Sequence, residues 1–313
     1  MTTIGFIDKN CALFDMDLSN YHKYFVISKR DRAWGLHIMD CGTSHIPAGA
    51  RFPSTDHPNQ YLLTWEKGRV LHEYQLIYLV EGAGIFESPG SGAVSIGPGT
   101  MLLLIPEIWH RYKPDPNEVW NTFWVGFDGV LARSFIKAIG MSHEMPVKMI
   151  GYHEKIVKIF LDILETSQIE FTGYQQVMAG DVFKLLGWIY AVRKKSEFKE
   201  HDIDRIIHTA KVMLMQTNEH YSIVQVADAL NMGYSKFRKL FKDYTGLSPG
   251  QFQMQHRVNK AVNLLNEDRM SIKEIASKLG FETTQYFSRL FRKKMGISPG
   301  AYRSQRIFSR TAK

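Results

Sequence analysis

The sequence predicts an α+β protein in two parts. The N-terminal part is expected to be a barrel of short strands with accessory helices. The C-terminal part is expected to be all-α, with one helical unit that occurs twice and a long helix between the copies. Short apolar runs divided by Gly and Pro fill the first 130 residues. Residues 222–252 are repeated in similar form at residues 271–302, and the basic charge is concentrated around this repeat.

The strands are predicted from runs of β-forming residues. Residues 74–80, YQLIYLV, stop at Gly82-Ala83-Gly84, and residues 85–88 resume the pattern. Further segments follow at the spacing typical of a barrel, namely residues 94–96, 101–105 and 120–127. A barrel of this kind can enclose a pocket for a small molecule.

Aromatic faces beside hydrogen-bonding groups suit a sugar ligand. Trp109, Arg111 and Trp124 supply both within the predicted barrel. The alternative for Trp124 is an ordinary core position in a strand. An N-terminal arm around Phe14 is a candidate for closing over the ligand.

Metal binding and catalysis are not expected. No H-x-H pattern occurs, and the histidines of the barrel region stand singly at His37, His45, His57, His72 and His110. There is no nucleophile elbow, phosphate-cradling glycine loop or paired carboxylates in a suitable context. We therefore expect neither a cofactor nor an enzyme.

Three helices are predicted between the barrel and the repeat. Apolar residues recur at helical spacing over residues 130–139, 156–164 and 182–190. From their apolar faces, these helices are expected to pack on their own barrel. Residues 193–200, RKKSEFKE, are charged and lack apolar periodicity, so they are the best candidate for a linker.

Each copy of the repeat begins with a capping box. Ser222 and Ser271 can accept from the first helical turn, while Gln225 and Glu274 reach back to the cap. The first helix of each copy carries one apolar stripe, and a short turn follows it. Gly246 and Gly296 are expected to end the second helix of each copy.

The second helix of each copy carries a basic face opposite its apolar stripe. A short helix, a tight turn and an exposed basic helix form the helix-turn-helix pattern. A single copy could equally be a small helical bundle whose charges only keep it soluble. Two copies favour a protein that binds two segments of a DNA duplex. A duplicated bundle that does not bind DNA has no need to keep a basic face in both copies.

The region between the copies predicts one continuous helix. Residues 249–265 place Phe252, Val258, Ala261, Val262 and Leu265 on one side. About 17 residues at roughly 1.5 Å each span on the order of 25 Å. Such a helix could hold two recognition helices about one DNA turn apart, roughly 34 Å.

The charge distribution supports a polyanionic partner. Residues 204–313 contain 19 Lys and Arg against 8 Asp and Glu, a net charge of +11, whereas residues 1–203 carry −3. A membrane surface is the weaker alternative, because no single helix combines a basic face with a large aromatic face. No apolar run reaches about 18 residues, no signal segment is evident, and Cys11 and Cys41 are the only cysteines, so we expect a cytoplasmic location.

The C-terminal residues resemble the AraC/XylS family of transcription regulators. The most specific part is the run IASKLGFETTQYFSRLFRKKMGISPGAYR in the second copy. The resemblance implies base-reading positions at Ser235, Arg238 and Lys239 in the first unit and at Thr284, Gln285 and Arg289 in the second, chemistry that suits base edges. Lys236, Lys242, Arg292 and Lys293 complete the expected DNA-binding set. Gly233 stands where the family often has Ser, which implies a weaker start of the first recognition helix.

The N-terminal part is similar to the family's cupin-like, sugar-binding barrel. By that resemblance Arg69, Trp109, Arg111, Thr122 and Trp124 fall at ligand-contacting positions, with a surface charge as the alternative for Arg69. The implied domains are a cupin-like ligand-binding and dimerisation domain (residues 1–195), a linker (196–203) and a double helix-turn-helix domain (204–313). The resemblance also implies that the helices between the barrel and the repeat pair two subunits, which is compatible with packing on their own barrel.

The implied function is that of a sugar-controlled regulator, an activator. Its implied partners are operator or promoter double-stranded DNA, a small-molecule effector, RNA polymerase and a second copy of the chain, with no membrane. The alternative is a constitutive DNA-binding regulator whose barrel is only a dimerisation scaffold. An enzyme with a DNA tether is a third possibility and lacks a catalytic constellation.

Overall fold

The chain forms two compact units, Met1–Glu197 and Phe198–Lys313. The computed structural model describes residues 20–50, 52, 61–198, 202–216, 221–267 and 270–311, except for the side chains of residues 306–311. Cys11, Phe14 and His57 lie outside the described residues. The predicted α+β class, with strands followed by helices, is confirmed.

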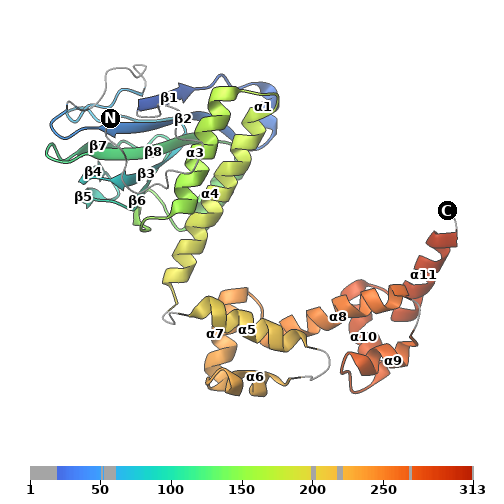
Figure 1. The fold of residues 1–313 in the computed structure, drawn as a ribbon. Coiled ribbons are helices and arrows are strands. Elements are labelled where there is room, and N and C mark those ends of the chain that lie inside the picture. The colour runs from blue at the N-terminus through green and yellow to red at the C-terminus, as the bar shows by residue number, and fades with distance from the viewer. Residues whose placement is uncertain are drawn as a thin grey trace, which may run out of the picture. The chain divides into compact units, whose positions relative to one another are not determined.

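The N-terminal unit contains two antiparallel sheets that face each other (Figure 1). The larger sheet has the strand order β1-β2-β8-β3-β6-β9, and the smaller has the order β5-β4-β7. The strands are β1 (Asn20–Tyr24), β2 (His37–Ile46), β3 (Tyr74–Glu81), β4 (Gly84–Ser88), β5 (Gly92–Ile96), β6 (Thr100–Leu104), β7 (Arg111–Pro114), β8 (Trp120–Asp128) and β9 (Val147–Met149).

Alternation of side chains along the strands gives the larger sheet two buried faces. On β3, Ile77 and Leu79 point into the barrel, where they pack with residues such as Phe86 of the smaller sheet. Leu76 and Tyr78 point to the other face and pack against helices. A strand that is buried on both faces has a nearly continuous run of apolar residues, and residues 74–80 form such a run.

Helices cover the outer face of the larger sheet. They are α2 (Val130–Ile139), α3 (Glu154–Ile169) and α4 (Tyr174–Ser196), and a short α1 (Lys29–Ala33) lies between β1 and β2. Figure 1 shows α3 and α4 side by side along this unit. Ile156, Phe160, Val182 and Leu186 are buried in the core that they share with the sheet. The prediction that these helices pack on their own barrel is therefore confirmed.

The C-terminal unit contains seven helices among its described residues. They are α5 (Ile203–Met215), α6 (Ile223–Ala229), α7 (Tyr234–Thr245), α8 (Pro249–Glu267), α9 (Ile272–Lys278), α10 (Thr284–Met295) and α11 (Pro299–Thr311). Both predicted capping boxes are present, at Ser222 with Gln225 and at Ser271 with Glu274. The predicted continuous helix between the copies is α8.

The repeat is longer than the similarity of residues 222–252 and 271–302 indicated, because α5 and α8 are also equivalent. Ile207 and Ala210 of α5 pack on the first unit as Val258 and Ala261 of α8 pack on the second. We call α5-α6-α7 unit one and α8-α9-α10 unit two. Each unit is closed by the helix that follows it. Gln253 Nε2 of α8 donates to Tyr221 O (3.0 Å), and Arg303 Nη2 of α11 donates to Met270 O (2.6 Å).

The predicted linker at residues 193–200 is wrong in its first half, because residues 193–196 form the last turn of α4. Arg193 and Lys194 form ion pairs with Glu197, at 3.2 and 2.7 Å, and these pairs hold the charged segment in the helix. Of the predicted boundary at 196–203, residues 199–201 lie outside the described part, and α5 begins at Ile203. No helix among the described residues is long and apolar enough to cross a membrane.

Candidate functional sites: a barrel cavity and a basic helical face

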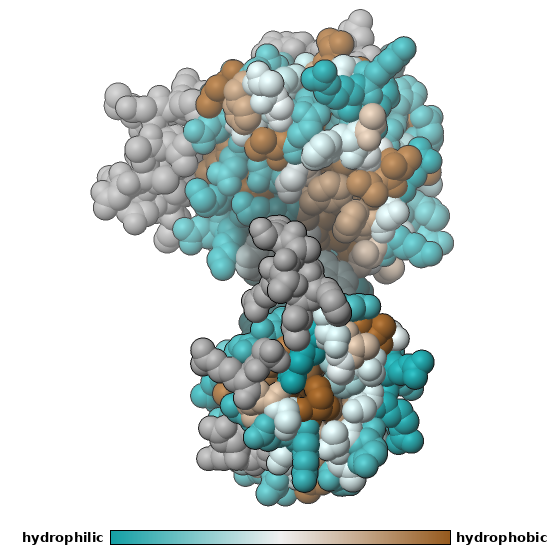
Figure 2. Space-filling view, turned by 90° about the vertical axis from the view of Figure 1, so that its right-hand side faces the viewer, coloured by the Kyte–Doolittle hydropathy of each residue, from teal (hydrophilic) through white to brown (hydrophobic). Residues whose placement is uncertain are grey.

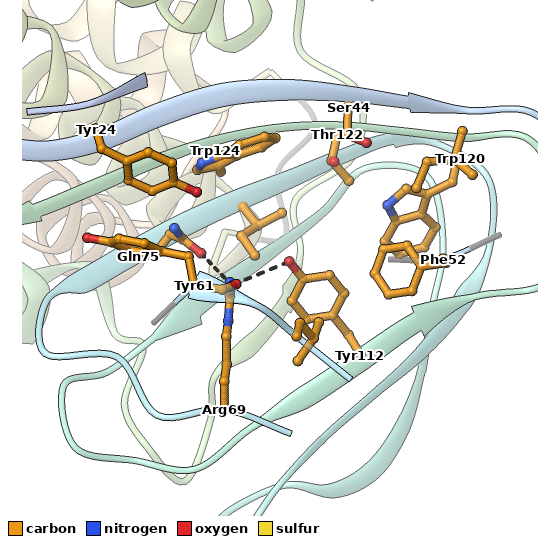
Figure 3. A pocket seen from close by; sticks show the side chains of 13 residues that line it. Tyr24, Ser44, Phe52, Tyr61, Arg69, Gln75, Tyr112, Trp120, Thr122 and Trp124 are labelled. Carbon is orange, nitrogen blue, oxygen red and sulfur yellow. Dashed lines mark hydrogen bonds between the residues drawn. The ribbon is translucent and has the colours of Figure 1, made fainter. Parts of the chain in front are cut away.

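A cavity of about 60 Å³ lies inside the barrel of the N-terminal unit (Figure 3). Strands of both sheets and the segment between β2 and β3 supply its walls. The lining residues are Tyr24, Ser44, Ile46, Phe52, Tyr61, Leu63, Arg69, Gln75, Ile77, Tyr112, Trp120, Thr122 and Trp124.

Arg69 is the centre of the polar wall. Its Nη1 donates to the carbonyl oxygen of Tyr61 (2.8 Å), and its Nη2 donates to Gln75 Oε1 (3.0 Å) and Tyr112 Oη (3.4 Å). Figure 3 shows the guanidinium between Gln75 and Tyr112. Contacts on three sides fix a long side chain that would otherwise be free to adopt many rotamers. The cavity therefore presents a positively charged group in a defined position.

His110 holds the other edge of the Arg69 guanidinium. Arg69 Nε lies 3.1 Å from His110 Nε2, and His110 Nδ1 lies 3.1 Å from the carbonyl oxygen of Ile108. Since a carbonyl only accepts, Nδ1 carries the proton and Nε2 is the acceptor for Arg69. Burial and the charge of Arg69 lower the pKa of His110 to about 3, so the ring is neutral at physiological pH. This buried, hydrogen-bonded role fits a single histidine without a metal.

A buried carboxyl lies behind the polar wall. Gln75 Nε2 donates to Asp40 Oδ1 (2.9 Å), so Gln75 connects Asp40 to Arg69. Burial, followed by repulsion from Glu73, raises the pKa of Asp40 to about 7, although Arg69, Gln75 and Trp124 act in the opposite direction. Gly126 is required opposite this carboxyl, because a Cβ there would lie 1.8 Å from Asp40 Oδ2.

Aromatic rings make up much of the remaining wall. Tyr24 and Tyr61 have ring centroids 4.2 Å apart, and Phe52 and Tyr112 have centroids 5.9 Å apart. Trp124 lies across Gly42 of the neighbouring strand, where a Cβ would lie 2.2 Å from the indole ring. Ring faces beside hydroxyl, amide and guanidinium groups suit a small polar ligand that also has apolar C–H surfaces.

Three of the five predicted ligand-contacting residues line the cavity, and two do not. Arg69, Thr122 and Trp124 are in the wall. Arg111 instead forms an ion pair with Glu87 (Nη2 to Oε2, 2.6 Å), and Trp109 Nε1 donates to the carbonyl oxygen of Lys67 (2.8 Å). Successive side chains of a strand point to opposite faces, so Tyr112, and not Arg111, points from β7 into the barrel.

Outside the barrel, Arg111 packs against aromatic rings. Its Cζ lies 4.2 Å from the ring centroid of Trp65 and 5.4 Å from that of Trp109, and its Nη1 donates to Trp65 O (2.8 Å). These contacts fasten the segment that carries Tyr61 and Arg69 to the smaller sheet. Arg111 and Trp109 are thus placed to support the cavity wall from outside.

The sequence did not single out Tyr24, Tyr61, Gln75 or Tyr112 as site residues. Tyr24 ends a strand that was not predicted, and Gln75 is a polar residue in an apolar run. Gln75 carried a usable signal, because a polar side chain in a strand buried on both faces requires a hydrogen-bonding partner.

The second candidate site is the outer face of α7 and α10, the second helices of the two units. Apart from Thr284, which is half-buried at the start of α10, the predicted DNA-binding side chains are exposed. The exposed set is Ser235, Lys236, Arg238, Lys239 and Lys242 on α7, and Gln285, Arg289, Arg292 and Lys293 on α10.

The charges of these two helices are available to an external partner. Arg238 and Lys239 of α7, and Arg289 and Arg292 of α10, form no ion pair with any carboxylate in the described part of the chain. Phe237 and Phe241 of α7, like Phe287 and Phe291 of α10, are fully buried on the opposite side. Each helix thus has one apolar and one cationic face, and phosphate groups fit the cationic face.

The two helices begin differently. The Thr283 side chain accepts from the Tyr286 backbone N–H at the start of α10 (3.1 Å). Gly233 occupies the equivalent position of α7 and has no side chain to accept such a bond. Both helices end at a glycine with positive φ, Gly246 and Gly296, as predicted.

Comparison with known families agrees with both sites. A family model described as an AraC-like ligand binding domain matches residues 55–174, and one described as a helix-turn-helix domain matches residues 226–305. The chain belongs to the AraC family. The first match contains most of the cavity wall, and the second contains both basic helices.

Several relatives are operon regulators of similar length. The Msm operon regulatory protein of Streptococcus mutans is 24% identical over 93% of this chain and 99% of its own. The arabinose operon regulatory protein of Salmonella typhimurium is 25% identical over 74% of this chain and 83% of its own. The raffinose operon transcriptional regulatory protein RafR of Pediococcus pentosaceus is 22% identical over 77% and 88%. The chain is therefore a transcription regulator with a ligand-binding and a DNA-binding domain.

Proposed function

We propose that this regulator is an activator whose DNA binding is controlled by a sugar held in the barrel cavity. The cavity is the observation that carries the proposal, because it combines a fixed guanidinium, several hydroxyl groups and aromatic rings around one space. Two relatives whose names refer to the arabinose and raffinose operons add support for a sugar.

The size of the cavity favours a small ligand. A space of 60 Å³ holds about four to six water molecules at roughly 10–15 Å³ each. A space of this size suits one sugar ring better than an oligosaccharide. The ring hydroxyls would form hydrogen bonds with the polar wall, and the Trp124 and Tyr61 rings would cover the C–H surfaces.

On the DNA side we assign two roles. Ser235, Arg238 and Lys239 of α7, with Thr284, Gln285 and Arg289 of α10, are proposed to read base edges in the major groove. Lys236, Lys242, Arg292 and Lys293 are proposed to contact phosphates, where they set affinity without sequence preference.

We further propose that the protein acts as a homodimer in the cytoplasm and contacts RNA polymerase at its promoter. Figure 2 shows hydrophobic side chains gathered on a face of the N-terminal unit. The exposed large hydrophobic side chains of that unit include Val130, Leu131 and Phe135 of α2 and Val177 of α4. Exposed apolar side chains that lie close together are typical of protein contacts, which supports pairing through these helices.

The test is a thermal-shift screen of the full-length protein with single sugars. All six tryptophans lie in the N-terminal unit, so their fluorescence follows this unit alone. A ligand that binds only the folded state raises the midpoint temperature of unfolding by mass action. We expect at least one monosaccharide to raise it for the wild type and to leave Trp124→Ala unchanged.

Trp34→Ala is the matched control, because this tryptophan is exposed and lies outside the cavity lining. It should retain the sugar-induced shift. A screen without any shift in the wild type would instead favour a constitutive regulator whose barrel is a scaffold.

A further inference from the structure

Four side chains of unit two form a series of cation–ring and tilted ring–ring contacts, here called the stack, from the long helix α8 to the recognition helix α10. Arg257 Cζ of α8 lies 5.8 Å from the ring centroid of Phe281 in the turn. The Phe281 and Tyr286 centroids are 6.2 Å apart, and Arg289 Cζ lies 5.7 Å from the Tyr286 centroid. The stack therefore ends on the arginine that we assign to base reading.

The inner end of the stack is fixed. Arg257 Nη1 donates to the carbonyl oxygen of Gly280 (3.1 Å), which lies in the turn between α9 and α10. Phe281 is only 7% exposed and also contacts Phe287 of α10, with centroids 5.0 Å apart. The guanidinium of Arg257 thus joins the long helix to the turn that sets the start of the recognition helix.

The outer end of the stack is held at its backbone and reaches solvent. Tyr286 is 40% exposed, and its backbone N–H donates to the Thr283 side chain. With its backbone fixed by the cap and its ring against Phe281, Tyr286 offers a fixed face to Arg289. One turn of helix separates Tyr286 from Arg289, a spacing that brings the two side chains together.

Unit one has no such stack. By the equivalence of α5 with α8 and of α7 with α10, its corresponding residues are Ile206, Met232, Lys236 and Lys239. None of these residues is aromatic, and the cap position holds Gly233. The stack is therefore a property of unit two and does not follow from the repeat itself.

We infer that Arg257, Phe281 and Tyr286 act as positioning residues that hold Arg289 in the conformation in which it reads a base, so that they determine the specificity of unit two. The inference rests on the proposed base contact of Arg289. An arginine that is already ordered loses less side-chain entropy when it binds, so its planar fork forms hydrogen bonds more favourably. An exposed cation–aromatic contact corresponds to about a two- to fivefold change in affinity.

The test measures DNA affinity of the full-length protein by fluorescence anisotropy. The probes are a duplex that the wild type selects from a random library and a scrambled duplex of the same composition. We expect Tyr286→Leu to weaken the selected duplex about two- to fivefold and to leave the scrambled duplex unchanged. Tyr286→Phe keeps the ring and should rescue most of the loss. Tyr152→Leu, which removes an exposed tyrosine from the N-terminal unit, is the matched control.

A double-mutant cycle separates positioning from an independent DNA contact of Tyr286. In an Arg289→Ala background the Tyr286→Leu effect should vanish, because there is no arginine left to position. The same loss in both backgrounds, or an equal loss on the scrambled duplex, overturns the inference. Arg257→Met should weaken the selected duplex more than the scrambled duplex, as Tyr286→Leu does, and this difference should also vanish without Arg289.

Arg289→Ala by itself tests the underlying base contact. It should weaken the selected duplex about 5- to 150-fold. Wild-type affinity in this variant overturns the base contact and the inference together. A loss in Arg289→Ala with none in Tyr286→Leu overturns the inference alone.

Discussion

Asp40→Asn should change how the stability of the N-terminal unit depends on pH. The carboxyl of Asp40 has a pKa raised by burial from 3.8 to about 7. Between these two values the folded protein holds a proton that the unfolded chain has released, so stability falls as the pH rises through this window. About three pKa units at 1.36 kcal/mol each lower the free energy of unfolding by about 4 kcal/mol by pH 8.

Asparagine cannot ionise, yet its side-chain oxygen can still accept from Gln75 Nε2. Any constant cost of burying the new amide is the same at each pH, so the comparison uses only the change with pH. The difference in free energy of unfolding between variant and wild type should therefore move by about 4 kcal/mol in favour of the variant between pH 4 and pH 8.

Urea unfolding followed by tryptophan fluorescence measures this difference, because all six tryptophans lie in the N-terminal unit. Parallel pH profiles for the two proteins would show that Asp40 ionises at an ordinary pH, which contradicts a buried hydrogen-bonded network of Asp40, Gln75 and Arg69.

Two further predictions concern the DNA-binding unit. Lys293→Ala should weaken binding to every duplex alike and reduce the slope of log affinity against log salt by about one, whereas Arg289→Ala should relax preference at one base position. Anisotropy titrations at several salt concentrations distinguish the two variants. Equal behaviour of the two variants would refute the assigned roles. Thr283→Ala should destabilise the C-terminal unit by about 1 kcal/mol, and Gly233→Ser should stabilise it by a few tenths of a kcal/mol. Thermal unfolding followed by helical circular dichroism checks both, and a neutral Thr283→Ala would contradict the capping argument.

Where structure depends on neighbours in the chain, it could be predicted from the sequence. The capping boxes at Ser222 and Ser271 involve residues three apart, and the helices α2, α3 and α4 show their apolar spacing directly. The α6 to α10 repeat followed from the same local signals. The equivalence of α5 and α8 was missed because the two helices share packing positions but little sequence.

Structure that depends on distant partners could not be predicted. In β2, Asp40 and Gly42 interrupt the apolar pattern, because one belongs to a buried polar network and the other makes room for Trp124. In β7, four residues carry too little alternation to show that Tyr112 faces inward and Arg111 outward. The inner and outer faces of that strand are set by its partner β4, which pairs Phe86 with Tyr112.

Control of DNA binding by a sugar requires a coupling between the two binding sites. The sugar must bind the DNA-competent state better than the other, because equal affinity for both states shifts nothing. In titrations of the full-length protein with the selected duplex, saturating sugar should make DNA binding more favourable by about 1–3 kcal/mol. Saturating duplex should raise sugar affinity by the same factor. DNA affinity that is identical with and without a bound sugar would contradict the proposed ligand control.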